Sequence, residues 1–401
     1  MEKYYIKSII GEIAKGIERL IEQKVIKSDK QVILYGLDRY SFAMRTILSN
    51  LGYHNIECYI SDDEVDVVAK KQDIENFRCR FLNQTTDLID VAMVEEKLHP
   101  FDEAVTILIA SPSYESIKEE LEKLGYSENT HFYTVYDFKD EELDGMFRNT
   151  TGMSLKEMQN VEKEILFHVD DFCTKHRLRY WVCGGTLLGT LRHKGFIPWD
   201  DDVDIFLPWQ DYLKFIDLFE ETERFSMLGM GTSEINDFPD PFAKVVDKRT
   251  LILEDIGTVK KVNPVAIDVF PLVGMPADDN ERHLFFTQYQ ELNRSIWQDF
   301  YATNGDIRVF SKWYKKQREF LERYDFDSAQ YVGVLGTAYG ERDCTVRDMY
   351  YSTVRMPFED IEVNVPVEYE EYLENHYGKD WSVIPDESKR KTHHNMSACW
   401  L

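Results

Sequence analysis

The stretch that decides the fold runs over Tyr180–Pro208 and reads YWVCGGTLLGTLRHKGFIPWDDDVDIFLP. It begins with a short apolar strand, Tyr180–Cys183, which is followed directly by Gly184 and Gly185. Two glycines allow the backbone to turn sharply, so a helix predicted over Thr186–Leu191 presents its free N–H groups to the turn. Such a helix end attracts phosphate. The first half of the stretch therefore predicts an anion-binding turn.

Three basic residues, Arg192, His193 and Lys194, follow the predicted helix within one turn. They could add positive charge for an anionic ligand, although exposed basic residues are commonly just solvated. The turn is not a Walker loop, because Thr190 stands where lysine is required, and the three-glycine dinucleotide pattern is also missing. The sequence thus indicates phosphate binding without a standard nucleotide motif.

The second half of the stretch is crowded with carboxylates. The sequence DDDVDIFL at 200–207 predicts a strand with Asp200, Asp202 and Asp204 on one face and apolar residues on the other. Like charges at this spacing raise one another's pKa unless a cation lies among them, and carboxylate oxygens select Mg²⁺ or Mn²⁺. A catalytic metal site is the favoured interpretation.

Two alternatives to the catalytic metal stay open, a solvated acidic face and a calcium loop of the EF-hand type. The calcium loop fits poorly, because Ile205 occupies the position that needs glycine and Asp211 replaces the bidentate glutamate. On the favoured interpretation, Asp211 is expected on the surface.

A third carboxylate interrupts the apolar run VAIDVFP at 265–271. Burial of an unpaired carboxylate is costly, so Asp268 is poorly explained as a chance charge in a strand. The alternative without a functional role is a helix cap or a surface position. We expect a neighbouring strand that brings Asp268 beside Asp202 and Asp204 and completes the site.

The region before this stretch predicts a separate α/β domain over 30–145, preceded by an amphipathic helix over 1–29. Short apolar runs alternate there with helical patterns, which is typical of a Rossmann-like unit. Its turn at Gly36 has one glycine where the dinucleotide fingerprint has three, so a structural role and nucleotide or sugar-nucleotide binding both stay open. The expected strands and helices are 32–35, 41–51, 56–60, 91–94, 105–110 and 115–124, with Asp62 and Asp63 after the second strand.

A second domain is expected over 150–401, after an acidic linker. Ser154 and Glu157 have the spacing of a capping box and are followed by an apolar helical stripe. Aromatic residues recur at helical spacing over 278–324, which predicts helix packing, with an aromatic binding pocket as the alternative.

Composition limits the function classes. The chain has 401 residues with 47 basic and 73 acidic side chains, a formal net charge of −26, which disfavours nucleic acid as a partner. No apolar stretch approaches the roughly 20 residues of a membrane span, so at most peripheral membrane contact is expected. The six cysteines match no zinc or redox spacing and predict reduced, mostly buried thiols. We therefore expect a cytoplasmic protein, at the inner face of the membrane if it contacts one.

With these residues in place, the chain resembles the LicD family, which includes the fukutin-related proteins. The resemblance runs from about Ser154 to the C-terminus, and its motifs are GGTLLGTLRHKGFIPWDDDVDIFLP at 184–208, AKVVDKRT at 243–250, AIDVFPLVGMP at 266–276, MPFEDIEVNVP at 356–366 and YLENHYGKDW at 372–381. It implies a nucleotidyltransferase-like mixed-sheet domain with a helical C-terminal part.

The resemblance also implies an activity, the transfer of a phosphorylated alcohol from a CDP-linked donor to a glycan. Carried over by position, the implied metal ligands for Mg²⁺ or Mn²⁺ are Asp202, Asp204 and Asp268. The implied donor-binding residues are Gly184, Gly185, Thr186, Arg192, Lys194 and Lys244. A sugar hydroxyl would attack the distal phosphorus with CMP as leaving group, and Asp200 or Asp268 would take the proton.

The family expectation for the substrate is phosphocholine, moved to a cell-surface glycan such as lipopolysaccharide, teichoic acid or capsule, or to its lipid-linked precursor. Three alternatives are kept. The first is transfer of an alditol phosphate (ribitol or glycerol phosphate) on the same fold. The second is a nucleotidyltransferase that releases pyrophosphate, and the third is a non-catalytic nucleotide or metal sensor.

Overall fold

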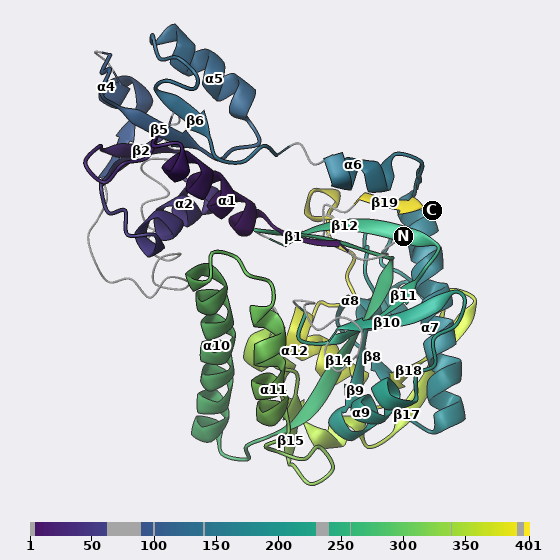
Figure 1. Ribbon diagram of the computed structural model, residues 1–401. Helices are drawn as coiled ribbons and strands as arrows, with labels where there is room; N and C mark the ends of the chain where they lie inside the picture. Colours follow the sequence, from purple (N-terminus) through teal and green to yellow (C-terminus); the bar gives the residue numbers. More distant parts are fainter. Residues whose placement is uncertain are drawn as a thin grey trace.

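The structure is a computed structural model, and it describes residues 5–61, 90–98, 101–138, 141–229, 240–256, 258–337, 339–390 and 397–401. An N-terminal α/β unit, purple to blue in Figure 1, lies beside a larger part that contains the remaining sheets and helices. The chain is a mixed α/β protein with both parallel and antiparallel sheets. None of the helices described is long and apolar enough to cross a membrane.

The N-terminal unit is built on a parallel sheet of strand order β4-β3-β2-β5-β6. Strands β2 and β5 are buried along their whole length, as expected for parallel strands covered on both faces. The strands are β2 (Val32–Tyr35), β3 (Ile56–Ser61), β4 (Asp90–Met93), β5 (Thr106–Ile109) and β6 (Phe132–Thr134), and the helices are α1 (Ile9–Glu22), α2 (Arg39–Asn50), α4 (Val94–Leu98) and α5 (Tyr114–Lys123).

The expected strands and helices of this unit are confirmed to within a few residues at their ends. The Rossmann-like arrangement itself stays a prediction, because the connection from β3 to β4 lies outside the described residues, as do Asp62 and Asp63.

The first described residues form a strand, so the prediction of one helix over 1–29 is wrong for this segment. Strand β1 (Tyr5–Ser8) pairs with β13 (Val259–Asn263) of the larger part. Ser8 then caps α1, because its Oγ accepts a hydrogen bond of 2.9 Å from the Gly11 N–H. The amphipathic helix is confirmed over Ile9–Glu22, where its apolar face is buried, and the prediction is wrong for 23–29, which lie beyond the end of the helix.

The strand β1 belongs to an antiparallel sheet that joins distant parts of the chain, in the order β1-β13-β12-β19-β7. Its other strands are β12 (Thr250–Ile256), β19 (Ser397–Trp400) and β7 (Thr151–Gly152). Because β1 and β19 are both in this sheet, the two ends of the chain lie near each other (Figure 1). We call it the junction sheet.

A mixed sheet forms the centre of the larger part. Strand β9 runs parallel to β14, whereas the remaining strand pairs are antiparallel. The strands are β8 (Trp181–Val182), β9 (Asp204–Pro208), β10 (Phe225–Gly229), β11 (Ala243–Asp247), β14 (Ala266–Met275), β15 (Tyr331–Gly333) and β16 (Thr345–Val346).

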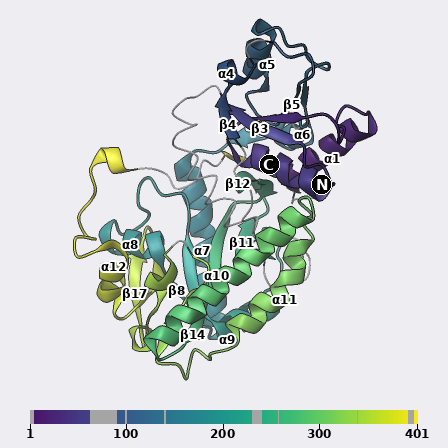
Figure 2. The ribbon, with the colours of Figure 1, turned by 90° about the vertical axis from the view of Figure 1, so that its left-hand side faces the viewer.

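Helices and a hairpin surround this sheet. Two long helices, α10 and α11, lie side by side in both views (Figures 1 and 2), and the expected aromatic packing is confirmed by stacked Phe285 and Phe320 with ring centroids 4.5 Å apart. The C-terminal part is only partly helical, contrary to the expectation, since it also contains the hairpin β17–β18. The elements are α6 (Glu141–Phe147), α7 (Leu155–His176), α8 (Gly184–Arg192), α9 (Trp209–Leu218), α10 (Asp279–Ala302), α11 (Val309–Leu321), α12 (Tyr369–Tyr377), β17 (Thr353–Phe358) and β18 (Ile361–Pro366), with short 3₁₀ turns at Gly340–Asp343, Arg347–Tyr350 and Glu387–Lys389.

Two further features are the start of helix α7 and the contact between the two parts of the molecule. Helix α7 begins at the predicted capping box, in which the Glu157 N–H donates to Ser154 Oγ and the Ser154 N–H donates to Glu157 Oε2. Helix α1 packs in one apolar core with α2, α10 and α11, so the N-terminal unit and the larger part share buried surface.

Five cysteines are free thiols, four of them buried, and Cys79 lies outside the described residues.

Candidate active site

The parallel pair β9 and β14 brings two of the predicted carboxylates together. Asp204 is the register partner of Asp268, and the Asp268 N–H donates to the Val203 carbonyl over 2.8 Å. The expectation that a neighbouring strand places Asp268 beside the DDDVD segment is confirmed as geometry. The roles of these residues as metal ligands stay predictions.

The strand predicted over 200–207 begins only at Asp204, so Asp200 and Asp202 do not alternate with it on one strand face. The reason is a turn before the strand, in which the Asp200 N–H donates to the Ile197 carbonyl over 2.9 Å. Gln159 of α7 donates to the Asp200 carbonyl, also over 2.9 Å. The segment before β9 is therefore held against α7, and it approaches the site as a loop.

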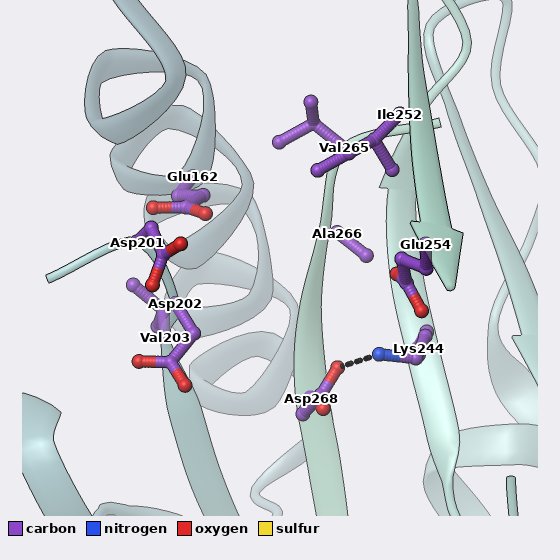
Figure 3. Close-up of a pocket in the computed structure, with 10 residues that line it drawn as sticks. All are labelled: Glu162, Asp201, Asp202, Val203, Lys244, Ile252, Glu254, Val265, Ala266 and Asp268. Carbon is purple, nitrogen blue, oxygen red and sulfur yellow. Dashed lines mark hydrogen bonds and ion pairs between the residues drawn. The ribbon is translucent and has the colours of Figure 1, made fainter. Parts of the chain in front are cut away.

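A pocket lies between this loop, α7 and the strands β11, β12 and β14 (Figure 3). Its acidic lining residues outnumber its one lysine. They are Glu162, Asp201, Asp202, Glu254 and Asp268, with Lys244 and the apolar side chains of Val203, Ile252, Val265 and Ala266. We call it the carboxylate pocket.

The two glycines are explained differently, Gly184 by its left-handed backbone and Gly185 by close approach to a carboxylate. Gly184 has a φ of +52°, and a Cβ added there would lie 3.4 Å from Asp204 Oδ2. A Cβ at Gly185 would lie 2.6 Å from Asp200 Oδ2, closer than real Cβ contacts. Cys183, the residue before α8, makes no side-chain cap, while the Gly184 N–H donates to Tyr372 Oη over 3.1 Å. The start of α8 thus faces the aspartates.

Thr186 lies inside the same turn and is 4% exposed. Its Oγ1 accepts a hydrogen bond of 2.9 Å from the Asp204 N–H. Thr186 therefore fixes the beginning of β9 relative to α8, which is a positioning contact that its assignment to donor binding did not anticipate.

Lys244 of β11 is buried and pairs with Asp268, with 2.5 Å between its Nζ and Asp268 Oδ1. Behind it, Lys261 of β13 lies 2.7 Å from Asp240 Oδ2 and 2.5 Å from Glu254 Oε2. Burial alone would lower the pKa of Lys244, but Asp268, Glu254 and Asp240 outweigh it and raise that pKa. Lys244 therefore stays a cation beside the pocket.

The other two predicted cations do not line the carboxylate pocket. Arg192 is half-buried, and its Nη1 donates to the carbonyls of Trp381 and Val383 over 3.1 and 3.4 Å. Lys194 is exposed in a left-handed turn, where its carbonyl accepts a 2.7 Å bond from the Glu359 N–H. Arg192 fastens the C-terminal segment in this structure, and Lys194 contacts the β17–β18 hairpin through its backbone.

Two aspartates of the site, Asp204 and Asp268, have a pKa above the ordinary value. Burial raises the pKa of Asp204 well above its ordinary value, and the charges of Asp202 and Asp268 raise it further. Burial also raises the pKa of Asp268, against the opposing effect of Lys244. Strongly perturbed carboxylates in a pocket are a physical indication of a functional site.

Glu162 is a pocket residue that the sequence did not reveal. It lies on α7, is 2% exposed, and its Oε2 has no hydrogen-bond partner among the described residues. Burial raises its pKa strongly, and the charges of Asp202 and Asp201 add to the effect. One signal was present, since Glu162 is four residues after Met158 and therefore lies on the apolar stripe of the helix.

The donor chemistry of the pocket fits Mg²⁺ or Mn²⁺, because it consists of carboxylate oxygens, one of them buried without a partner. Across the described ranges, however, no three His, Cys, Asp or Glu side chains converge closely enough to hold an ion by themselves. Magnesium commonly uses one or two carboxylates and completes its shell with water and substrate phosphates. The residues therefore fit an ion that arrives with a phosphorylated ligand.

The expectation that Asp211 lies on the surface is wrong. Asp211 is 5% exposed on α9, and its Oδ2 accepts a 2.6 Å hydrogen bond from Arg179 Nε. The physical reason is that the first turn of α9 packs against the chain that leads into β8. Because Arg179 engages this carboxylate, Asp211 has a structural partner where the calcium-loop alternative needs a calcium ligand.

Comparison with known proteins supports one family. The model of the family described as "LicD/FKTN/FKRP, nucleotidyltransferase domain" matches residues 177–330, which include α8, β9, β11 and β14. The lipopolysaccharide cholinephosphotransferase LicD of Haemophilus influenzae is 27% identical over 263 residues, which cover 61% of this chain and 98% of that protein.

Two uncharacterized rickettsial proteins match over shorter segments. The Rickettsia typhi protein is 40% identical over 52 residues, covering 13% of this chain and 17% of its own length. The Rickettsia prowazekii protein is 34% identical over 61 residues, which cover 15% of this chain and 23% of that protein. Together, the comparisons show that residues 177–330, which carry the site-bearing strands, match the LicD family, and they support an enzyme of the phosphotransferase class.

Proposed function

We propose that this enzyme transfers a phosphorylated alcohol, most simply phosphocholine, from a CDP-linked donor to a hydroxyl of a cell-surface glycan or its lipid-linked precursor, and releases CMP. The observation that carries the proposal is the register of Asp204 with Asp268, with Asp204 beside the start of α8 and Lys244 paired to Asp268. The cholinephosphotransferase from Haemophilus supports the choice of phosphocholine and of a lipopolysaccharide-type acceptor.

The chain's own groups would bind the donor diphosphate from two sides. The first N–H groups of α8 offer partial positive charge; Cys183 makes no side-chain cap, and the Gly184 N–H donates to Tyr372 Oη. Lys244 offers a full charge from the opposite strand, β11. A donor diphosphate held between these groups would have its distal phosphorus beside the aspartates. This placement favours reaction at that phosphorus.

Asp202, Asp204 and Asp268 would hold Mg²⁺ or Mn²⁺, which when bound supplies charge neutralisation for the diphosphate. In the reaction, the sugar oxygen forms a bond to the distal phosphorus and the bond from phosphorus to the CMP oxygen breaks. Asp200 or Asp268 would take the hydroxyl proton. Asp200 lies at the Gly185 turn and Asp268 at the Lys244 pair, so both are beside the proposed diphosphate position.

Further proposals concern the folds of the two parts of the chain and the cellular compartment. We propose a nucleotidyltransferase-like fold for 150–401 and a Rossmann-like arrangement for 30–145. The parallel order β4-β3-β2-β5-β6 supports the latter. Free thiols at five cysteines support a reducing compartment such as the cytoplasm.

The decisive experiment mixes the full chain and Mg²⁺ with CDP-choline, CDP-ribitol or CDP-glycerol and a panel of glycans. The proposal predicts CMP and a mass increment of one phosphorylated alcohol on the acceptor, with Asp204→Asn as the inactive control. Release of pyrophosphate from CTP would instead indicate a nucleotidyltransferase. Tight binding of nucleotides without any turnover would indicate a sensor.

A further inference from the structure

Glu162 projects from α7 into the carboxylate pocket beside Asp201 and Asp202 (Figure 3). It is 2% exposed, its Oε2 is buried without a hydrogen-bond partner, and it forms no ion pair with any described Lys or Arg. A buried charge without a partner destabilises a protein by several kcal/mol, on the order of the whole effect of a large core mutation. The Glu162 carboxylate therefore needs a proton or a cation to neutralise it.

A second buried carboxylate on the same helix shows that α7 does not generally leave acids unsatisfied. Asp170 lies two turns further on and is 9% exposed. It accepts hydrogen bonds from Tyr180 Oη at 2.5 Å and from Arg355 Nη2 at 3.0 Å. The missing partner of Glu162 is thus specific to the carboxylate pocket.

The pocket's own cation is engaged elsewhere. Lys244 pairs with Asp268 on the strand side of the pocket, and the view in Figure 3 places Glu162 and Asp201 on the helix side. Asp201 is buried at 4% exposure, so both carboxylates on the helix side are largely shielded from solvent. Two hard oxygen donors of this kind match the usual protein contribution to a Mg²⁺ site, which is completed by water and phosphate oxygens.

We propose that Glu162, together with Asp201, directly binds a divalent cation on the helix side of the pocket when a nucleoside diphosphate is present. The inference rests on the proposed function for the diphosphate, and it adds a ligand pair distinct from Asp202, Asp204 and Asp268. The diphosphate oxygens would complete the coordination that two carboxylates begin.

The test uses the full chain and compares Glu162→Gln with Asp170→Asn. Binding of Mn²⁺ in the presence of CDP is measured by electron paramagnetic resonance, and melting temperatures are recorded without metal and with Mn²⁺ plus CDP. For Glu162→Gln we expect an unchanged or higher melting temperature without metal, and Mn²⁺ affinity lower by at least about tenfold. For Asp170→Asn we expect the reverse pattern, a lower melting temperature and unchanged Mn²⁺ affinity.

Unchanged Mn²⁺ affinity in folded Glu162→Gln would overturn the proposal, because glutamine mimics a protonated glutamate that is only structural. No Mn²⁺ binding by the wild-type protein with CDP would overturn it as well. If Glu162→Gln does not fold, Asp201→Asn carries the same expectation. Failure of the proposed function is a separate result, namely a wild-type protein that binds Mn²⁺ and CDP but releases no CMP from any CDP-linked donor.

Discussion

Two helices in this molecule follow a buried strand and a glycine turn, and their first turns differ. After β2 and Gly36, helix α2 is closed by Asp38, whose Oδ1 accepts hydrogen bonds from the N–H groups of Tyr40 at 3.0 Å and Ser41 at 2.9 Å. The Asp38 N–H donates in turn to Ser41 Oγ at 3.2 Å. This capping box satisfies the N–H groups that a phosphate would need.

Helix α8 begins after β8 with no cap from the preceding residue, Cys183, although the Gly184 N–H donates to Tyr372 Oη, and Asp204 and Asp200 approach its two glycines. The difference teaches that a glycine turn alone does not predict an anion site. What the next residues do with the first N–H groups decides whether the helix start is closed, as in α2, or open to a ligand, as in α8.

The largest expected effect comes from the carboxylates opposite the open helix start. Asp202→Asn and Asp204→Asn should each reduce turnover by about a thousandfold, because metal-held charge stabilisation is worth several kcal/mol. The melting temperature without metal should stay level or rise, since burial and repulsion already disfavour the Asp204 anion. CMP release and thermal unfolding measure the two effects.

The control for this prediction is Asp211→Asn. It removes the partner of Arg179 on α9, so stability should fall while turnover and metal binding persist. Near-normal turnover in folded Asp202→Asn and Asp204→Asn, with loss of metal binding in Asp211→Asn, would refute the catalytic-metal proposal in favour of a calcium loop.

Much of the site's frame could be predicted because its signals are local. Asp204 and Asp268 each interrupt an apolar strand, and Gly184 and Gly185 follow a strand directly, so their sequence neighbours indicate their importance. The expectation that Asp204 and Asp268 lie on neighbouring strands also follows from these local signals, and β9 and β14 pair in this way. Their functional roles come from the resemblance and stay predictions.

The rest depends on contacts between segments far apart in the chain. Arg192 donates to the carbonyls of Trp381 and Val383, and β1 pairs with β13. No local sequence pattern indicates either contact. Glu162 was missed because a single glutamate on a helix is ordinarily solvated. It is buried beside the loop before β9, which Gln159 of α7 holds by donating to the Asp200 carbonyl.

The second prediction tests the close approach at the open helix start. Gly185→Ala places a Cβ 2.6 Å from Asp200 Oδ2, so the turn or the aspartate must move. Displacements of about 1 Å in a site can cost on the order of a hundredfold in rate, and we expect a loss of this size in CMP release.

The matched substitution in the closed turn is Gly36→Ala. Gly36 has a φ of +103°, but a Cβ there meets nothing closer than 3.8 Å. Backbone strain should therefore reduce stability by about 1 kcal/mol or somewhat more, with turnover unchanged. Equal losses of activity in the two variants would contradict the distinction between the turns.

The third prediction concerns a buried carboxylate that, unlike Asp204, is fully paired. Burial would raise the pKa of Asp247, but hydrogen bonds from Arg249 and Arg224 outweigh it and lower that pKa. A lowered native pKa means that this group stabilises the fold above its unfolded value, near 4, and that the contribution is lost as the pH falls through the native value. Asp247→Asn should thus lower the melting temperature at pH 7, and the difference from wild type should shrink towards pH 3.

The smallest effect is expected at the closed helix start itself. Asp38→Ala removes the side chain that accepts hydrogen bonds from two N–H groups of α2, and loss of such a cap costs about 1 kcal/mol of stability. Ser113→Ala is the matched control, because Ser113 precedes α5 without making a side-chain cap, so its stability should change by only a few tenths of a kcal/mol. Urea unfolding measures both, and CMP release should match wild type in both, since neither residue lines the carboxylate pocket. A loss of turnover in Asp38→Ala comparable to that of Asp204→Asn would show that the helix start of the N-terminal unit takes part in the reaction, and the comparison of a closed with an open start would then fail.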